Sequence, residues 1–175
     1  MGVNMFSKIG VCIIKKVLVG AILVSCVSFA SDIGNSNEMS YDKETTCIVR
    51  HLKVYEEPSW VAKINLSNGK KLYFCSPKSM IEFYHQPGKW HEIGVKSEDD
   101  FKDIIVTDYS SKRAIEARGA FYVYGSNITS PAGDDLVPFS TYEDAKKFAK
   151  KYNGKRVLNF SEIKEALIRL LNGRI

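Results

Sequence analysis

The segment from Trp60 to Tyr84 reads WVAKINLSNGKKLYFCSPKSMIEFY and contains the signals that decide the fold. Apolar and polar residues alternate on both sides of an Asn-Gly pair at residues 68 and 69, which is typical of a β-hairpin. Ser76 can then cap a helix, and Pro77 suits its first position. Met80 to Tyr84 supply the apolar face of that helix. The segment therefore predicts two strands followed directly by a helix.

The same order of elements is predicted in the second half of the chain. The elements are a strand at residues 120–124, a turn at 130–134, a strand at 136–139, a helix from residue 140 and a strand at 157–160. Ser140 and Glu143 form the S-x-x-E capping box with which this helix begins. Ile104 to Val106 predict the equivalent third strand of the first half. The sequence thus predicts an α+β fold of two homologous ββαβ units, residues 45–110 and 111–175.

The second unit is expected to end in a C-terminal helix over residues 161–171. One face of that helix is apolar, formed by Ile163, Ala166, Leu167, Leu170 and Leu171. We expect this face to pack on the domain, because an exposed leucine face is an aggregation liability.

Acidic residues near the strand ends are interpreted as structural or solvated. Asp108 is expected to make a contact at the end of a strand. The neighbouring Asp134 and Asp135 lack the spaced oxygen ligands of a calcium loop, so we expect a solvated turn there.

The first 30 residues have the features of a secretory leader. Three lysines precede an almost unbroken apolar run from Val17 to Ala30. This run is too short to span a bilayer but suits a signal peptide. The mature protein is therefore expected in the bacterial cell envelope, on the periplasmic side.

Two modes of processing fit this leader. Residues 23–26, with the sequence LVSC, fit a lipobox and predict lipidation of Cys26. Residues 28–30, with the sequence SFA, fit ordinary signal peptidase and predict a soluble periplasmic protein. The lipobox is slightly favoured, and residues 31–44 would then be a flexible tether between the membrane and the domain.

The charge of the chain resides largely in the leader. The full sequence has a net charge of +5 from 25 basic and 20 acidic residues. Removing residues 1–30 takes away three lysines and no acid, so the mature protein carries about +2. The remaining lysines are scattered, and no basic-aromatic stripe indicates a nucleic-acid partner.

Removal of the leader leaves Cys47 and Cys75 as the cysteines of the mature protein. In an oxidising compartment they could form a disulfide, and as free thiols they could bind a soft metal. Cys75 and Met80 flank the predicted strand-helix junction. A thiol and a thioether are both soft donors, so their presence there favours copper(I) among such metals. Cys75 lies on the strand face opposite Leu72 and Phe74, so it is expected to be less buried than core residues.

Short segments along the folded chain resemble one known family. They are Trp60-Val61-Ala62, Pro77 to Met80, Val106 to Tyr109, Phe121 to Val123, Gly125-Ser126, Pro131 to Gly133 and Leu136 to Phe139. These segments are similar to those of the NosL family, accessory lipoproteins of nitrous oxide reductase. The resemblance implies a copper(I)-binding chaperone that helps assemble a periplasmic copper enzyme, with nitrous oxide reductase as the client. It also implies two ββαβ units, in agreement with the predicted repeat.

Several positions depart from the family pattern. NosL-like chains usually carry Cys-x-x-Cys-Gly-Met shortly before the tryptophan. Counting back from Trp60 places the first cysteine on Cys47, the second on Arg50 and the methionine on Leu52. The Pro-Met-Gly of the family stands here as residues 131–133, with Ala132 in place of methionine.

Other donors can take the place of these missing sulfurs. Cys75 stands where the family more often has an acid, and Met80 matches a methionine that is commonly present. His51 lies on the same predicted loop as Cys47. Because copper(I) is satisfied by two or three soft donors, a metal site of Cys47, Cys75 and Met80, assisted by His51, is chemically reasonable.

Three functions remain open. The leading one is a copper(I)-binding accessory protein, and the second is a metal-free assembly module in which a disulfide joins Cys47 to Cys75. The third is a thiol-redox or organometal-cleaving enzyme, suggested by likeness of the family fold to organomercurial lyases. The sequence contains no Gly-rich phosphate loop, G-x-S-x-G elbow or His-Glu-x-x-His run, so we do not expect an enzyme.

Overall fold

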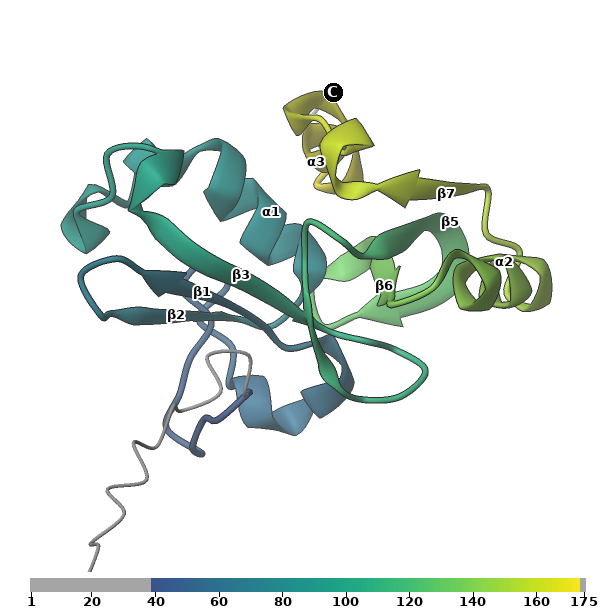
Figure 1. Ribbon diagram of the computed structural model, residues 1–175, viewed down its shortest axis with the longest axis horizontal. Helices are drawn as coiled ribbons and strands as arrows, with labels where there is room; N and C mark the ends of the chain where they lie inside the picture. The colour runs from purple at the N-terminus through teal and green to yellow at the C-terminus, as the bar shows by residue number, and fades with distance from the viewer. Residues whose placement is uncertain (1–38, 174–175) are drawn as a thin grey trace, which may run out of the picture. The chain divides into compact units, whose positions relative to one another are not determined.

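The computed structural model describes residues 39–173, and the strands of its first sheet lie between residues 62 and 116. That sheet comprises β1 (Ala62–Leu66), β2 (Lys71–Phe74), β3 (Phe101–Thr107) and β4 (Ala114–Glu116), in the antiparallel order β2-β1-β3-β4 (Figure 1). The predicted leader, Cys26 and residues 31–38 of the predicted tether lie outside the described residues. Within residues 39–173, no helix has the length and apolar character needed to cross a bilayer.

The hairpin of β1 and β2 forms as predicted. Gly69 has a φ of +87°, in the left-handed region that glycine adopts without strain. The Asn68 Oδ1 accepts the backbone N–H of Lys70 at 3.0 Å, which closes the turn. Trp60 was expected in the first strand but lies in a short 3₁₀ helix, Pro58–Trp60, so β1 begins at Ala62.

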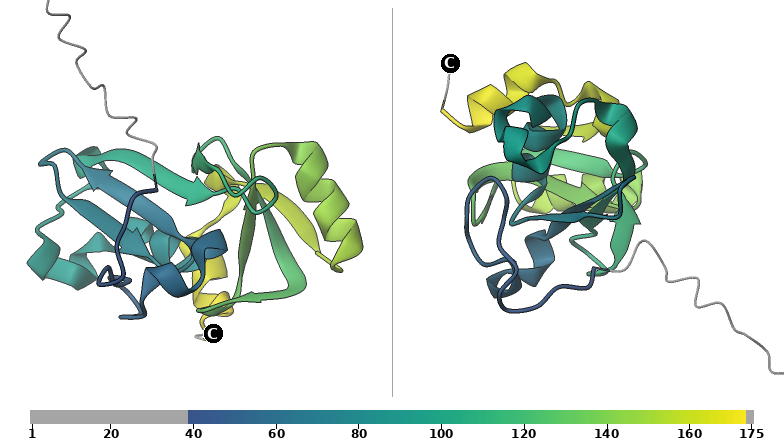
Figure 2. Two further views of the ribbon diagram at one scale, coloured as in Figure 1. Left: turned by 90° about the horizontal axis from the view of Figure 1, so that it is seen from below. Right: turned by 90° about the vertical axis from the view of Figure 1, so that its left-hand side faces the viewer.

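Helix α1 (Pro77–His85) begins at the predicted cap, and its C-cap is Gln86. The Ser76 Oγ accepts the backbone N–H of Ser79 at 3.1 Å. This helix covers one face of the first sheet, and residues 39–60 cover the other (Figures 1 and 2). Residues 39–44, assigned to the tether from sequence, include Tyr41, which packs edge-on against Tyr73 of β2.

Coverage of both faces explains the burial of Cys75. The sequence placed this residue opposite Leu72 and Phe74 and therefore predicted that it would be less buried. That prediction is wrong, because Cys75 is only 1% exposed. Its side chain faces the layer formed by residues 39–60, which a strand pattern alone cannot reveal.

The second sheet repeats the element order of the first. It comprises β5 (Phe121–Ser130), β6 (Gly133–Phe139) and β7 (Arg156–Asn159), with α2 (Tyr142–Lys151) between β6 and β7. Its strand order is β6-β5-β7, so in both sheets the first strand pairs with the second and third. The α+β class is confirmed. The homology of the two units stays a prediction.

The start of α2 differs by one residue from the prediction. Thr141, not Ser140, is the N-cap, and its Oγ1 accepts the backbone N–H of Asp144 at 3.1 Å. The Ser140 hydroxyl instead donates to the Asp108 carboxylate, which also accepts the backbone N–H groups of Ser110 and Ser140. Asp108 therefore links the two sheets, and its predicted role as a strand-end contact is confirmed.

Asp135 was wrongly expected in a solvated turn. Strands β5 and β6 extend further than predicted, so the turn consists of residues 131 and 132 alone. The side chain of Asp135 is buried and accepts the backbone N–H of Lys78 at 2.8 Å and the Ser130 hydroxyl at 2.6 Å. Burial raises the pKa of Asp135 above its usual value. This carboxyl group joins the second sheet to the first turn of α1.

Helix α3 (Glu165–Leu171) packs against α1, as predicted for the C-terminal helix, but starts later than predicted. Residues 160–162 form a 3₁₀ helix, and Ile163 is buried just before α3 begins. Ile168 is the buried residue of α3 itself, whereas Leu170 is 46% exposed. Asn172 is the C-cap of α3.

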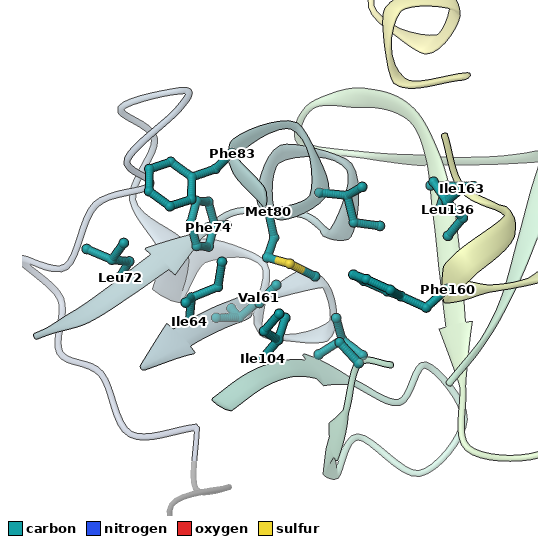
Figure 3. Close-up of a cluster of buried hydrophobic side chains, with 14 of the residues drawn as sticks. Val61, Ile64, Leu72, Phe74, Met80, Phe83, Ile104, Leu136, Phe160 and Ile163 are labelled. Atoms are coloured by element: carbon teal, nitrogen blue, oxygen red, sulfur yellow. The ribbon is translucent and has the colours of Figure 1, made fainter. Parts of the chain in front are cut away.

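The main core contains side chains from both sheets and from α1. Its members include Val61, Ile64, Phe74, Met80, Phe83, Ile104, Leu136, Phe160 and Ile163 (Figure 3). A second cluster lies between the second sheet and α2 and includes Trp60, Phe139 and Phe148. Burial of this apolar surface is the main force that holds the strand-helix junctions in place.

Candidate functional site: a buried thiol pair

The two cysteines of the folded domain lie in segments that pack side by side. Cys75 directly follows β2, and Cys47 lies in a tight turn closed by a β-bridge between Thr46 and Lys53. Within that turn, Cys47 N–H donates to the Leu52 carbonyl at 2.8 Å. The neighbouring Ile48 N–H donates to the Tyr73 carbonyl of β2 at 3.0 Å. This bond docks the turn on the edge of the first sheet and brings Cys47 to Cys75.

The side chains of Cys47 and Cys75 are hydrogen-bonded to each other. Both are free cysteines, and their exposed fractions are 0% and 1%. The sequence left a disulfide and a pair of metal ligands as alternatives. The structure brings the two sulfur atoms together in the reduced form, and the role of each as a ligand stays a prediction.

Hydrogen bonds favour a thiolate at Cys47. Its sulfur accepts the S–H of Cys75 and backbone N–H groups, including that of Arg50 at 3.3 Å. The Cys75 S–H bond, aided by these N–H groups, lowers the pKa of Cys47 to about 6 even though burial opposes the charge. The lowered pKa favours the thiolate form of Cys47, which is the soft, nucleophilic form of the sulfur.

The protonated form is favoured at the second cysteine. Donation to Cys47, burial and the nearby Cys47 charge together raise the pKa of Cys75 above its usual value. Its sulfur also lies 3.9 Å from the Ser79 hydroxyl in the first turn of α1. The pKa values of the two thiols are therefore shifted in opposite directions, so Cys47 is the thiol that loses its proton first.

Met80 lies in the main core. Its exposed fraction is 0%, and its thioether points among apolar side chains toward Phe160 (Figure 3). Within residues 39–173, no group of three His, Cys, Asp or Glu side chains is arranged to hold a metal ion. The site therefore rests on the two cysteines.

His51 and Leu52 are exposed on the Cys47 turn. His51 has a φ of +58°, in the left-handed region, and its backbone N–H donates to the Cys47 carbonyl at 2.8 Å. Leu52 stands where the resemblance expects a methionine and is 40% exposed. Ala132, at the other such position, offers its backbone carbonyl to the Lys78 ammonium at 2.7 Å.

Arg50 is a part of the site whose interactions sequence reasoning missed. Its side chain forms an ion pair with Glu82 of α1 at 2.8 Å and donates to the Asn172 Oδ1 at 2.7 Å. Arg50 stands where the family resemblance expects a cysteine. No local pattern points to partners that lie 32 and 122 residues away.

Comparison with known proteins gives a consistent result. The NosL family model matches residues 38–168. The copper-binding lipoprotein NosL of Stutzerimonas stutzeri is 30% identical over 95 residues, which are 54% of this chain and 50% of that protein. The chain therefore spans about half the length of this curated relative.

One solved structure shows the same fold, and a second gives a weaker match. The crystal structure of the copper chaperone NosL from Shewanella denitrificans matches with a TM-score of 0.64 and 25% identity, covering 74% of this chain and 96% of that one. The solution structure of apo-NosL from Achromobacter cycloclastes has a TM-score of 0.44 and 25% identity, covering 61% and 87%.

Proposed function

Because this chain belongs to the NosL family, we propose that it is a copper(I)-binding accessory protein that holds its metal on Cys47 and Cys75. The observation that supports this most strongly is the buried pair of sulfur atoms in hydrogen-bond contact. A chaperone must bind its metal firmly enough to carry it and must give it up to a client by ligand exchange. A two-sulfur site meets both needs.

The donor chemistry fits copper(I) better than other biological metals. Thiolates are soft ligands, and copper(I) is satisfied by two or three of them. Structural zinc sites use four ligands in a tetrahedron, and calcium takes at least six oxygen ligands. The described residues offer two cysteine sulfurs at this site and no third charged or imidazole ligand. This donor set favours the soft monovalent ion.

Metal uptake would replace the hydrogen bond between the two sulfurs. Cys47 supplies a thiolate already held by backbone N–H groups. Cys75 must give up the proton that it donates to Cys47, since thiolates are the forms that bind metals. The exposed residues His51 and Leu52 lie on the Cys47 turn, so a client would meet that turn first. We propose His51 as an auxiliary donor during transfer.

The client and the location are proposed from the family resemblance. The resemblance implies nitrous oxide reductase as the recipient of the copper. The lipobox predicts that Cys26 anchors the protein to the membrane, which would keep it at the periplasmic surface where such a client matures.

Copper(I) competition titration tests the proposal. Reduced protein and its Cys47→Ser variant are titrated anaerobically against a chromophoric copper(I) chelator. The wild type is expected to bind about one copper(I), and loss of the thiolate should weaken binding by orders of magnitude. Met80→Leu is the matched control, because it removes a buried sulfur while nearly conserving volume, and its affinity should match the wild type.

Two results would contradict this function. One is equal copper affinity for the wild type and for a Cys47→Ser, Cys75→Ser double variant. The other is protein isolated from the periplasm that has no free thiol and takes up no copper(I) after reduction. The second result would instead support a metal-free assembly module with a structural disulfide.

A further inference from the structure

Arg50 connects the Cys47 turn to two helices. Its Nη2 donates to the Glu82 Oε2 at 2.8 Å and to the Asn172 Oδ1 at 2.7 Å. Asn172 in turn donates its Nδ2 to the same Glu82 oxygen at 2.9 Å. The three side chains therefore form a closed triangle of hydrogen bonds, which we call the Arg50 triangle.

The Arg50 triangle is held by the rigid elements of the domain. Glu82 belongs to α1, and its side chain is only 6% exposed. Asn172 is the C-cap of α3, and its backbone N–H donates to the Ile168 carbonyl at 3.0 Å. The Arg50 side chain is 24% exposed, so the ion pair lies partly out of water. A charge-assisted bond in such surroundings is stronger than one on an open surface.

The backbone of the same arginine contacts the metal-site sulfur. Arg50 N–H donates to the Cys47 Sγ at 3.3 Å. Because the side chain is fixed by Glu82 and Asn172, the position of this N–H relative to the sulfur is fixed as well. The turn also contains His51 at a positive φ, a conformation that a histidine adopts at some cost. The Arg50 side chain gives this turn a further contact that opposes relaxation of the strained conformation.

We propose that Arg50 is a positioning residue for the thiol site, and that the Arg50 triangle lets α1 and α3 set the affinity of the site for copper(I). This inference rests on the proposed function and deepens it. Groups that hold a metal ligand in place typically change affinity by about 10- to 100-fold when they are removed. A client that displaced the end of α3 would loosen the turn and weaken the hold on the metal.

Four single variants test the proposal by copper(I) competition titration. Arg50→Ala and Asn172→Ala each break the triangle and are expected to weaken binding by about 10-fold or more. Arg50→Lys should keep most of the wild-type affinity. A single terminal nitrogen of Arg50 makes the bonds to both Glu82 and Asn172, and a lysine ammonium has three donors with which to replace them. Arg169→Ala is the matched control, since Arg169 is an exposed arginine of α3 that pairs loosely with Glu165 at 3.9 Å.

A double variant separates positioning from general stability. In the Cys47→Ser background, Arg50→Ala should cause no further loss of copper affinity, although it should still lower the melting temperature. Equal affinities of wild type and Arg50→Ala would overturn the inference, as would an equal loss with and without Cys47. Failure of the wild type itself to bind copper(I) would instead refute the proposed function, so the two failures are distinguishable.

Discussion

The two strand-helix junctions of the domain have the same local construction and different chemistry. In each, a buried phenylalanine ends the strand, one residue follows, and a hydroxyl side chain caps the helix, as Phe74-Cys75-Ser76 and Phe139-Ser140-Thr141. Cys75 is buried and donates to the Cys47 sulfur, whereas Ser140 is exposed and donates to the Asp108 carboxylate. At both junctions, the residue between the strand and the helix thus donates a hydrogen bond to a side chain from another segment.

The segments that surround each junction decide which chemistry the junction can perform. Residues 39–60 cover the first junction and bring the Cys47 sulfur to it, which makes a soft-donor pair out of contact with water. The second junction has an oxygen pair that fastens two sheets together. Oxygen donors suit hard cations and structural hydrogen bonds, whereas sulfur donors suit copper(I).

The largest expected effect is on copper(I) affinity, when the residue between strand and helix at one junction is replaced by its counterpart at the other. Cys75→Ser gives the first junction the hydroxyl of the second and should reduce copper(I) affinity by orders of magnitude, because one of two soft donors is lost. Ser140→Cys should create no new copper site, because its partner is a carboxylate. Competition titration of both variants measures this. A second copper(I) bound by the Ser140→Cys variant as tightly as the first would refute the comparison.

Removing the anion of the second junction should affect stability instead of copper binding. Asp108 accepts hydrogen bonds from Ser140, Ser110 and Ser111. Asp108→Ala leaves these donors without a partner, so we expect a loss of about 3 kcal/mol in unfolding free energy. Chemical denaturation measures the loss, and copper affinity should match the wild type. A variant as stable as the wild type would show that Asp108 does not fasten the sheets.

The two junctions should also respond to different pH ranges. Because folding lowers the pKa of Cys47, the unfolded chain binds the thiol proton of this residue more tightly than the folded chain does. The stability that Cys47 contributes therefore grows as pH rises from about 6 toward about 8.5. Although burial opposes it, hydrogen bonding from Ser140 and from backbone N–H groups holds the pKa of Asp108 below its usual value. Its contribution is present above about pH 4 and is lost as pH falls through that lowered pKa.

Unfolding of metal-free, reduced protein at several pH values checks this difference. The gap in unfolding free energy between the wild type and Cys47→Ser should widen from about pH 5 to about pH 8. The gap between the wild type and Asp108→Asn should stay constant over the same range. A Cys47 gap that does not change with pH would show that Cys47 is not a thiolate.

The helix caps provide the smallest test. Ser76 is buried and Thr141 is exposed, although each accepts one N–H in the first turn of its helix. Replacement of a cap by alanine costs about 1 kcal/mol. Ser76→Ala should lower the unfolding free energy more than Thr141→Ala does, because a buried backbone N–H that loses its partner cannot form a hydrogen bond to water instead. Equal losses in thermal unfolding would show that burial of the first junction has no energetic consequence.

Local elements were predictable because their causes are local. The Asn-Gly turn, the Ser76 cap and the alternation in β1 and β2 depend on residues within a few positions of one another. The position of the second cap could not be settled in this way. Ser140 with Glu143 and Thr141 with Asp144 are equally good capping patterns, and the choice follows from Asp108, which is 32 residues away from Ser140.

The site was predictable in its residues but not in its geometry. Both cysteines were identified from sequence, whereas their contact depends on how the turn around Cys47 docks on β2. Met80 was predicted as a weaker ligand from its place beside the strand-helix junction and from the family resemblance, but its side chain lies among core residues. The burial of Asp135 and the bond from Arg50 to Asn172 depend on contacts between the two units, and the bond from Arg50 to Glu82 joins residues 32 positions apart. No local pattern encodes these contacts.

The central claim is that Cys47 and Cys75 bind one copper(I) together. X-ray absorption at the copper edge of the reduced, copper-loaded protein tests it most directly. We expect a first coordination shell of sulfur in the wild type, and replacement of part of that sulfur by lighter atoms in Cys75→Ser. A shell of nitrogen and oxygen alone, or an identical spectrum for the double serine variant, would contradict it.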